Sequence, residues 1–480
     1  MSRPRRRTVA AWTLLVVIAA CAVNPATGRR ELMLVSESQE VQLGRDADPS
    51  ITASYGLVDR PELQEYVAGL GTALAVDSER PDLPWSFKVV DDPIVNAFAL
   101  PGGFIYVTRG ILAHFDSEAE LAGVLGHEIG HVTARHSASQ ISRQQLQQIG
   151  LVAGMVVSER FRQYGGLAMQ AVQLLNLSYS RGDESQADRL GLRYIAREGY
   201  DADAMIGVFE MLGAVSGGGG GRLPEWQMTH PLPENREAAI RQEIAATAVS
   251  REGKVNRDAY LDMIDGLVWG ENPREGYFEG ARFLHPELAF EVTFPEGWQT
   301  VNQRTLVAGI APTEDAVLML GAEPEGGDPS VALQAFLSAE GVSGGPASTV
   351  AVNGLPAARA RFRLSTEEGT LAGEVMFLRY GDLTYRLLGY ATPDRWATVA
   401  GVTDAMFRSF AEVTDPGVLG VQPLRLDIVT LRQATSLNSW VRANPQPVDV
   451  ETLERLNRVS AGEVLGAGTR IKTVAGTPVG

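Results

Sequence analysis

Apolar residues in the first half of the chain follow the period of an α-helix. Ser117 is followed three residues later by Glu120, an arrangement typical of the capping box that begins a helix. Leu121, Val124 and Leu125 then recur at helical spacing and form an apolar stripe. The pattern therefore predicts a core helix that begins at about Ser117.

The second half of the chain changes to the period of strands. Arg359, Arg361 and Arg363 alternate with apolar neighbours, as in a half-exposed strand. Several such segments, together with two helical ones, predict an α+β domain with an antiparallel sheet over residues 280–413. Residues 424–474 follow a Pro-Gly linker and show the order strand, helix, helix, strand, which predicts a small βααβ module.

The amino terminus has the layout of a secretory signal. Four arginines precede a short apolar stretch, and small residues precede Cys21, the only cysteine. The segment Ile18–Cys21 resembles a bacterial lipobox, so we expect residues 1–20 to be a signal peptide and Cys21 to be lipidated. Ala22, in place of aspartate, favours the outer membrane. An ordinary signal peptide, or a signal anchor, with an incidental cysteine is the alternative.

Composition and charge restrict the possible functions. The chain has 480 residues, 45% of them hydrophobic, and a net charge of −16. A surface this acidic repels phosphate, so we expect no nucleic-acid partner. A single cysteine excludes an internal disulfide. No apolar run of 18 or more residues follows the amino-terminal segment, which predicts a periplasmic body held at the membrane by its lipid anchor only.

Five of the six histidines lie between residues 114 and 230, and two of them belong to the segment His127-Glu128-Ile129-Gly130-His131. Helix positions four apart differ in direction by only about 40°, so both imidazoles face one ion. Glu128 is offset from them but can reach a water on that ion. The alternative is two solvated histidines on a polar face. The apolar neighbours argue against it, because unpaired buried imidazoles are costly.

A third ligand is expected from a second helix. Hydrolytic zinc sites usually have three protein ligands and keep one position for water. Glu184 stands near the start of a helical segment that ends before Gly199, and Asp188 follows one turn later on the same face. There Asp188 can accept the second N–H of a ligating histidine. Taken alone, the two carboxylates also fit a solvated acidic face.

Four motifs, in order, resemble those of the HtpX-like and CAAX-prenyl-protease family of zinc metallopeptidases, above all its soluble periplasmic branch. They are Asn24–Gly28, Asn96–Gly103, His127–His131 with the later Glu184 and Asp188, and Thr229–Arg236. The resemblance covers about residues 24–245. It implies a mainly α-helical, zincin-type metallopeptidase domain with a small β edge, which we place at residues 21–270.

The resemblance also implies roles for single residues. One Zn²⁺ per chain is expected, with His127, His131 and Glu184 as its ligands. Glu128 is then the general base, and Asp188 stabilises the ligands without binding the metal itself.

Two residues of the last motif have open roles. The resemblance implies that His230 lies on a loop that can approach the zinc and occupy its open position as a plug. The alternative is a loop histidine that caps the following helix. Arg236 is expected either to stabilise the oxyanion of the reaction or to form a salt bridge.

A strand is predicted just before the metal-binding helix. Gly103, Phe104, Ile105 and Tyr106 begin a segment rich in aromatic and β-branched residues. The sequence alone fits an interior strand equally well, but the family resemblance favours an edge strand that binds an extended substrate by backbone pairing.

The βααβ order of residues 424–474 resembles a divergent LysM domain, a module that binds peptidoglycan. The usual Gly-Asp-Thr after the first strand is replaced by Gln433-Ala434-Thr435, which makes glycan binding uncertain. Peptidoglycan is therefore only a possible partner.

These inferences lead to one main function and one alternative. The main hypothesis is a zinc metalloendopeptidase of the bacterial envelope that cleaves misfolded or misassembled periplasmic and outer-membrane proteins. The alternative is a non-catalytic chaperone, or a peptidoglycan-binding lipoprotein, with a relic metal site. Intact His127, Glu128, His131 and Glu184 favour the enzyme.

Overall fold

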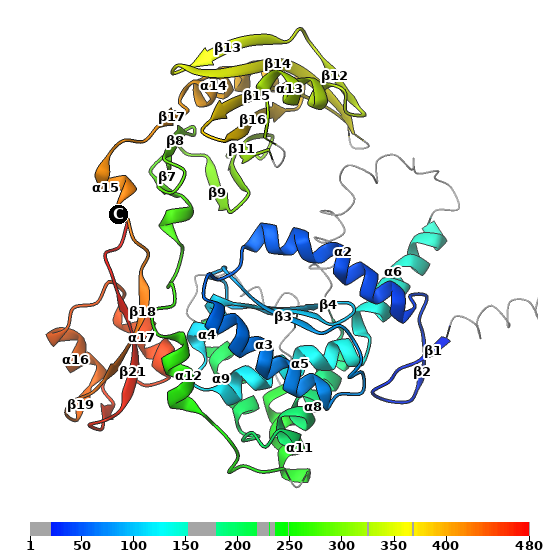
Figure 1. The fold of residues 1–480 in the computed structure, drawn as a ribbon, viewed down its shortest axis with the longest axis vertical. Coiled ribbons are helices and arrows are strands. Elements are labelled where there is room, and N and C mark those ends of the chain that lie inside the picture. The colour runs from blue at the N-terminus through cyan, green and yellow to red at the C-terminus, as the bar shows by residue number, and fades with distance from the viewer. Residues whose placement is uncertain are drawn as a thin grey trace, which may run out of the picture. The chain divides into compact units, whose positions relative to one another are not determined.

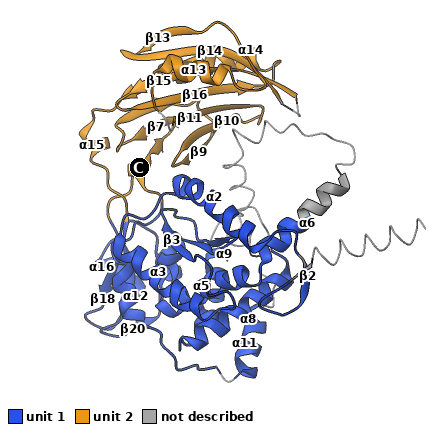
Figure 2. Ribbon diagram, turned by 45° about the vertical axis from the view of Figure 1, so that its right-hand side comes forward, with its two compact units in different colours: residues 1–270, 425–475 blue, residues 271–424, 476–480 orange. Residues whose placement is uncertain are grey.

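The computed structural model describes residues 21–151, 179–217, 230, 236–247, 249–323, 326–366 and 369–479. The chain forms two compact units, one of residues 1–270 and 425–475 and one of residues 271–424 and 476–480 (Figure 2). The first unit is therefore discontinuous in sequence. The expected signal peptide, residues 1–20, lies outside the described residues.

Helices make up most of the first unit (Figure 1). They are α2 Glu37–Tyr55, α3 Pro61–Val76, α4 Arg109–His114, α5 Glu118–Thr133, α6 His136–Leu151, α8 Arg181–Arg197, α9 Ala204–Gly217, α11 Arg236–Ala246 and α12 Arg257–Ile264. The helix predicted at Ser117 is α5, which is buried along almost its whole length and packs against α3, α8 and α9. None of the helices described is both long enough and apolar enough to cross a membrane.

Glycines allow α5 and α8 to lie unusually close together. A Cβ atom on Gly191 of α8 would lie 2.8 Å from the backbone nitrogen of His127, and one on Gly126 of α5 would lie 3.1 Å from Cα of Gly191. Such distances leave no space for a side chain in a close-packed interior. The contact therefore fixes His127 against the helix that carries Glu184.

A three-stranded sheet precedes α5 in the chain. Its strands are β3 Ser86–Val90, β4 Ala97–Leu100 and β5 Phe104–Thr108, in the order β3-β5-β4. β5 pairs in parallel with β3 and antiparallel with β4, so it is the central strand. The expectation that Gly103, Phe104, Ile105 and Tyr106 form a substrate-binding edge is therefore wrong, because both backbone edges of β5 are already paired.

The second unit is rich in antiparallel sheet. An eight-stranded sheet has the order β12-β14-β15-β16-β11-β10-β9, with β13 beside β14, and a smaller sheet has the order β17-β8-β7-β6. The strands are β6 Tyr277–Glu279, β7 Arg282–His285, β8 Phe290–Thr293, β9 Gln299–Gln303, β10 Leu306–Ile310, β11 Ala316–Ala322, β12 Val342–Gly344, β13 Ser348–Val352, β14 Leu355–Thr366, β15 Gly369–Tyr380, β16 Leu383–Ala391 and β17 Ala411–Glu412. The helical segments are η2 Pro273–Glu275, α13 Pro329–Leu337, α14 Trp396–Arg408 and α15 Pro416–Leu419.

Both faces of the larger sheet are covered by helices. On β15, Val375 and Phe377 pack in one core cluster with Leu333 of α13. Their neighbours on the opposite face pack in a second cluster with Met406 and Phe407 of α14. This arrangement follows from the alternation of side chains along a strand and explains why residues 375–378 of β15 are all apolar.

Residues 425–475, here called the C-terminal module, belong to the first unit. Its elements are β18 Arg425–Thr430, β19 Thr435–Ser436, α16 Leu437–Ala443, α17 Val450–Asn457, β20 Val464–Leu465 and β21 Arg470–Ala475. β18 pairs antiparallel with β21, and β19 with β20. The likeness to a LysM domain stays a prediction.

Candidate metal centre

Four side chains from separate segments meet at one point inside the first unit. His127 and His131 come from α5, Glu184 from α8 and His230 from the segment before α11. Each offers a ligand atom, and these atoms all lie within 4.8 Å of one another. All four residues are at most 3% exposed. The structure thus brings together the three predicted ligands and the predicted plug.

The distances between these atoms suit a single tetrahedral ion. Nε2 of His127 lies 3.0 Å from Nε2 of His131 and 3.4 Å from Nδ1 of His230. Oε1 of Glu184 lies 2.9 Å from that Nδ1 and 3.4 Å from Nε2 of His131. Four ligands at the usual zinc distances are about 3.3 Å apart. The cluster therefore has the size of a zinc site.

In both histidines of α5, Nδ1 faces a supporting residue and Nε2 faces the centre of the cluster. Nδ1 of His127 lies 2.9 Å from Oδ1 of Asp188 and donates to it, which leaves a lone pair on Nε2. Nδ1 of His131 lies 3.0 Å from Nδ1 of His136, whose Nε2 faces Oε1 of Gln186 at 3.4 Å. Lone pairs thus converge with a carboxylate at one buried point, and a cation is the group that satisfies them.

Arg236 forms buried ion pairs with Asp188 and Glu184. Its Nε and Nη2 donate to both carboxylate oxygens of Asp188 at 2.9 and 2.7 Å, and Nη1 lies 2.7 Å from Oε2 of Glu184. Burial opposes the charged form of Asp188, but Arg236 and His127 outweigh it and lower the pKa of this carboxyl. Of the two roles expected for Arg236, this geometry supplies the salt bridge.

Glu128 is fully buried beside the cluster. Among the described residues, neither of its carboxylate oxygens has a hydrogen-bond partner, and the nearest cationic candidate is Nε2 of His230 at 3.6 Å. Burial raises the pKa of the Glu128 carboxyl, and the nearby His230 and His127 offset only part of this effect. A carboxylate in this position is suited to accept and return a proton.

Two neighbours of the cluster were not predicted from the sequence. His136 contacts His131 as described above, and the ring of Tyr179 stacks on His131 with centroids 3.9 Å apart. The hydroxyl of Tyr179 hydrogen-bonds to Ser137 at 2.9 Å. The only signal in the sequence was the position of His136, five residues after His131.

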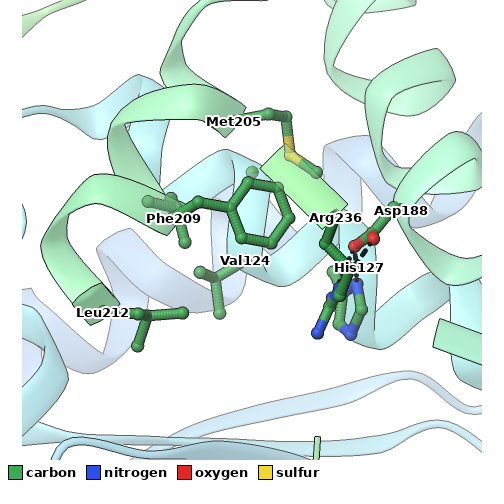
Figure 3. A pocket seen from close by; sticks show the side chains of 9 residues that line it. Val124, His127, Asp188, Met205, Phe209, Leu212 and Arg236 are labelled. Carbon is green, nitrogen blue, oxygen red and sulfur yellow. Dashed lines mark hydrogen bonds and ion pairs between the residues drawn. The ribbon is translucent and has the colours of Figure 1, made fainter. Parts of the chain in front are cut away.

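An apolar pocket adjoins the cluster (Figure 3). Figure 3 shows His127, Asp188 and Arg236 on one side of it and Leu212 of α9 on the other, with Phe209 between them. The complete lining is Gly123, Val124, His127, Asp188, Met205, Val208, Phe209, Leu212 and Arg236. Apolar surface is thus available directly beside His127.

Other predicted site residues are not part of this cluster. The backbone of Cys21 begins β1 (Cys21–Val23), which pairs with β2 (Arg30–Leu32), but its side chain is outside the described atoms. The segments on both sides of His230, residues 218–229 and 231–235, also lie outside the described residues.

Comparison with known proteins identifies the family of the chain. The sequence model described as peptidase family M48 matches residues 61–244. The mitochondrial metalloendopeptidase OMA1 of Schizosaccharomyces pombe is 30% identical over 231 residues, which are 48% of this chain and 68% of that protein. The chain belongs to peptidase family M48. The match includes His127, Glu128, His131, Glu184 and Arg236, all within the range of the family model.

Bacterial M48 relatives are similar over a smaller share of their length. The β-barrel assembly-enhancing protease of Yersinia pestis is 32% identical over 220 residues, 44% of this chain and 45% of that protein. The Escherichia coli K12 protein of the same name is 31% identical over 245 residues, 48% of this chain and 50% of that protein. The M48 chain described here thus spans about half the length of these two relatives.

Proposed function

We propose that this M48 chain is a zinc-dependent endopeptidase of the bacterial cell envelope. The observation that carries the proposal is the buried cluster of His127, His131 and Glu184 beside the carboxylate of Glu128, which has no hydrogen-bond partner among the described residues. Two imidazoles, one carboxylate and a nearby general base are the set of groups that metal-assisted peptide hydrolysis requires. A relic site would not need a buried carboxyl group without a hydrogen-bond partner, which is costly to keep.

His127, His131 and Glu184 would hold one zinc ion. When bound, zinc acts as a Lewis acid and makes a nucleophile available at neutral pH. Asp188 orients His127 and keeps its proton on Nδ1, and His136 does the same for His131. Arg236 in turn fixes Asp188 through two hydrogen bonds.

Glu128 would serve as the proton carrier of the reaction. It accepts a proton from the attacking water and delivers it to the amine of the leaving peptide. Burial excludes bulk water from its carboxylate, so the proton is retained between the two steps.

His230 would act as a reversible plug. Its Nδ1 lies within 3.4 Å of His127 and 2.9 Å of Glu184, the place of a fourth ligand. Hydrolytic zinc sites keep this fourth position open for water. The observed position of His230 would therefore be a resting state, and His230 would have to move away before substrate binds.

Substrate would lie along β4 instead of β5. β4 is an edge strand of its sheet and contacts α5, so an extended peptide paired with it passes the metal-binding helix. The apolar pocket beside His127 would receive an apolar side chain of that peptide.

The names of the relatives support a role in envelope protein quality control. Two of them are called β-barrel assembly-enhancing proteases, which fits misassembled periplasmic or outer-membrane proteins as substrates. Lipidation of Cys21 would tether the protein, most simply to the outer membrane, and the C-terminal module would contribute any contact with peptidoglycan.

Casein cleavage by the full-length protein tests this function. Glu128→Gln should retain zinc and lose cleavage by about 100-fold or more, since it removes the general base but no ligand. Glu210→Gln is a matched control, because Glu210 forms an exposed ion pair with Arg241 and is not one of the four clustered residues. Equal rates for the wild type and Glu128→Gln would exclude peptidase action and favour the non-catalytic alternative.

A further inference from the structure

The C-terminal module reaches the start of the metal-binding helix through a buried lysine. Lys472 on β21 is completely buried, and its Nζ donates to the carbonyl oxygens of residues 113–115 at 3.1 to 3.3 Å. Oδ1 of Asp116 lies 2.9 Å from the same nitrogen. These acceptors form the end of α4 and the turn before α5. A buried ammonium requires such a full set of acceptors, since it has three donors and no acceptor of its own.

A second cation of the module binds the first turn of α5. Nη1 and Nη2 of Arg458 donate to the two carboxylate oxygens of Glu120 at 2.5 and 2.7 Å. The same carboxylate accepts a bond from the backbone nitrogen of Asp116 at 2.7 Å. Gly207 of α9 leaves space for the pair, because a Cβ atom there would lie 2.5 Å from Oε1 of Glu120. Bidentate pairs of this kind fix orientation as well as distance.

The position of Glu120 links this contact to the metal centre. Glu120 and His127 are seven residues apart on α5, which places them about two turns apart on nearly the same face. A helix is stiff over two turns, so a shift or tilt at Glu120 moves His127 and Glu128 relative to α8.

We propose that Lys472 and Arg458 are positioning residues for the metal centre. They hold the α4–α5 turn and the first turn of α5 in place. The C-terminal module thereby helps to position the residues of the metal centre. Asn457 supports this arrangement, because its side chain exchanges two hydrogen bonds of 2.8 Å with the backbone of Lys472. The expected effect on catalysis rests on the proposed peptidase function, whereas the positioning of α5 does not.

Hydrogen exchange of the metal-free, full-length protein tests the positioning without any need for activity. In Lys472→Met and in Arg458→Gln, the backbone amides of residues 118–126 should exchange about tenfold faster than in the wild type. Arg470→Gln is the matched control. Arg470 lies in the same module but pairs with Asp262 of α12 at 2.5 Å, so exchange in α5 should stay unchanged.

Peptidase kinetics provide the second readout. We expect kcat to fall roughly tenfold or more in both variants while KM stays within about twofold, because the metal-binding helix is displaced but the substrate surface is kept. Arg458→Lys should recover at least half of the lost kcat, since it restores a cation beside Glu120.

Defined results would overturn the inference. Wild-type exchange in α5 for both variants contradicts it, and so does a lower kcat without faster exchange. If Lys472→Met does not fold, Arg458→Gln decides by the same two readouts, because the side chain of Arg458 is 17% exposed and its loss leaves the core intact. If the wild type shows no peptidase activity, the proposed function fails and the exchange result still decides the positioning role.

Discussion

Nδ1 of His230 lies 2.9 Å from Oε1 of Glu184, although 46 residues separate them in sequence. The contact places an imidazole where the metal-binding residues of α5 and α8 face one another. Under the proposed function this position is needed for water and substrate, so the contact would correspond to a closed site.

Removal of His230 should therefore activate the enzyme. We expect His230→Ala to raise the initial rate of casein cleavage several-fold, because the variant keeps His127, His131 and Glu184 but has no side chain in the fourth position. His285→Ala, a change in the second unit, is a control that should leave the rate unchanged. An unchanged or lower rate in His230→Ala at full zinc occupancy would speak against the plug.

Loss of His136 should weaken zinc binding. Nδ1 of His136 lies 3.0 Å from Nδ1 of His131. If it accepts the proton of that nitrogen, the lone pair on Nε2 of His131 is directed at the cluster. His136→Phe keeps a ring at this position but removes the acceptor, and we expect zinc affinity to fall by about 10- to 100-fold. Competition with a zinc chelator measures the change. Wild-type affinity in this variant would show that His136 does not orient His131.

A side chain at Gly191 should disrupt both stability and metal binding. Its Cβ would lie 2.8 Å from the backbone nitrogen of His127, so Gly191→Ala forces α8 away from α5 and costs about 1–3 kcal/mol of unfolding free energy. Gly213→Ala on α9 is the matched control, since among the described residues no atom outside its own helix lies within 4 Å of a Cβ at that position. Thermal unfolding and zinc content of the two variants provide the comparison. A Gly191→Ala protein as stable and as zinc-rich as the control is the contrary result.

His114 should make the first unit less stable in mild acid. Burial, together with the nearby cations Lys472 and Arg458, lowers the pKa of His114 to about 4. Between pH 6.5 and 4 the imidazole is therefore protonated only in the unfolded chain, so stability falls as the pH decreases. The contribution of this residue amounts to about 3 kcal/mol by pH 4. In urea unfolding at several pH values, the free energy of unfolding should depend less on pH in His114→Gln than in the wild type. The same pH dependence in both proteins would contradict the prediction.

The sequence predicted the parts of the site that depend on local spacing. His127 and His131 share a face of α5 because a helix repeats every 3.6 residues, and Ser117 does cap this helix by accepting a bond from the backbone nitrogen of Glu120. The carboxylate of Glu120, however, binds the nitrogen of Asp116 and Arg458 instead of closing a capping box. This difference depends on a partner 338 residues away, which no local pattern contains.

Long-range packing explains the other differences. A strand that begins at Phe104 has the same composition whether it is central or at an edge, and only its pairing with β3 and β4 places it at the centre. The close contact between Gly126 and Gly191 could not be predicted either, because a glycine in a helix does not indicate which other segment packs against it. Lys472 reads as a surface residue of a strand, although it is completely buried.

Zinc analysis of the purified full-length protein tests the central claim most directly. Mass spectrometry of metal content should find one zinc ion per chain in the wild type and in Glu128→Gln, and less than about a tenth of that amount in His127→Ala or Glu184→Ala, which each remove a ligand. A wild-type protein that binds no zinc under any loading condition, or a Glu184→Ala variant that binds it as tightly as the wild type, would contradict the account.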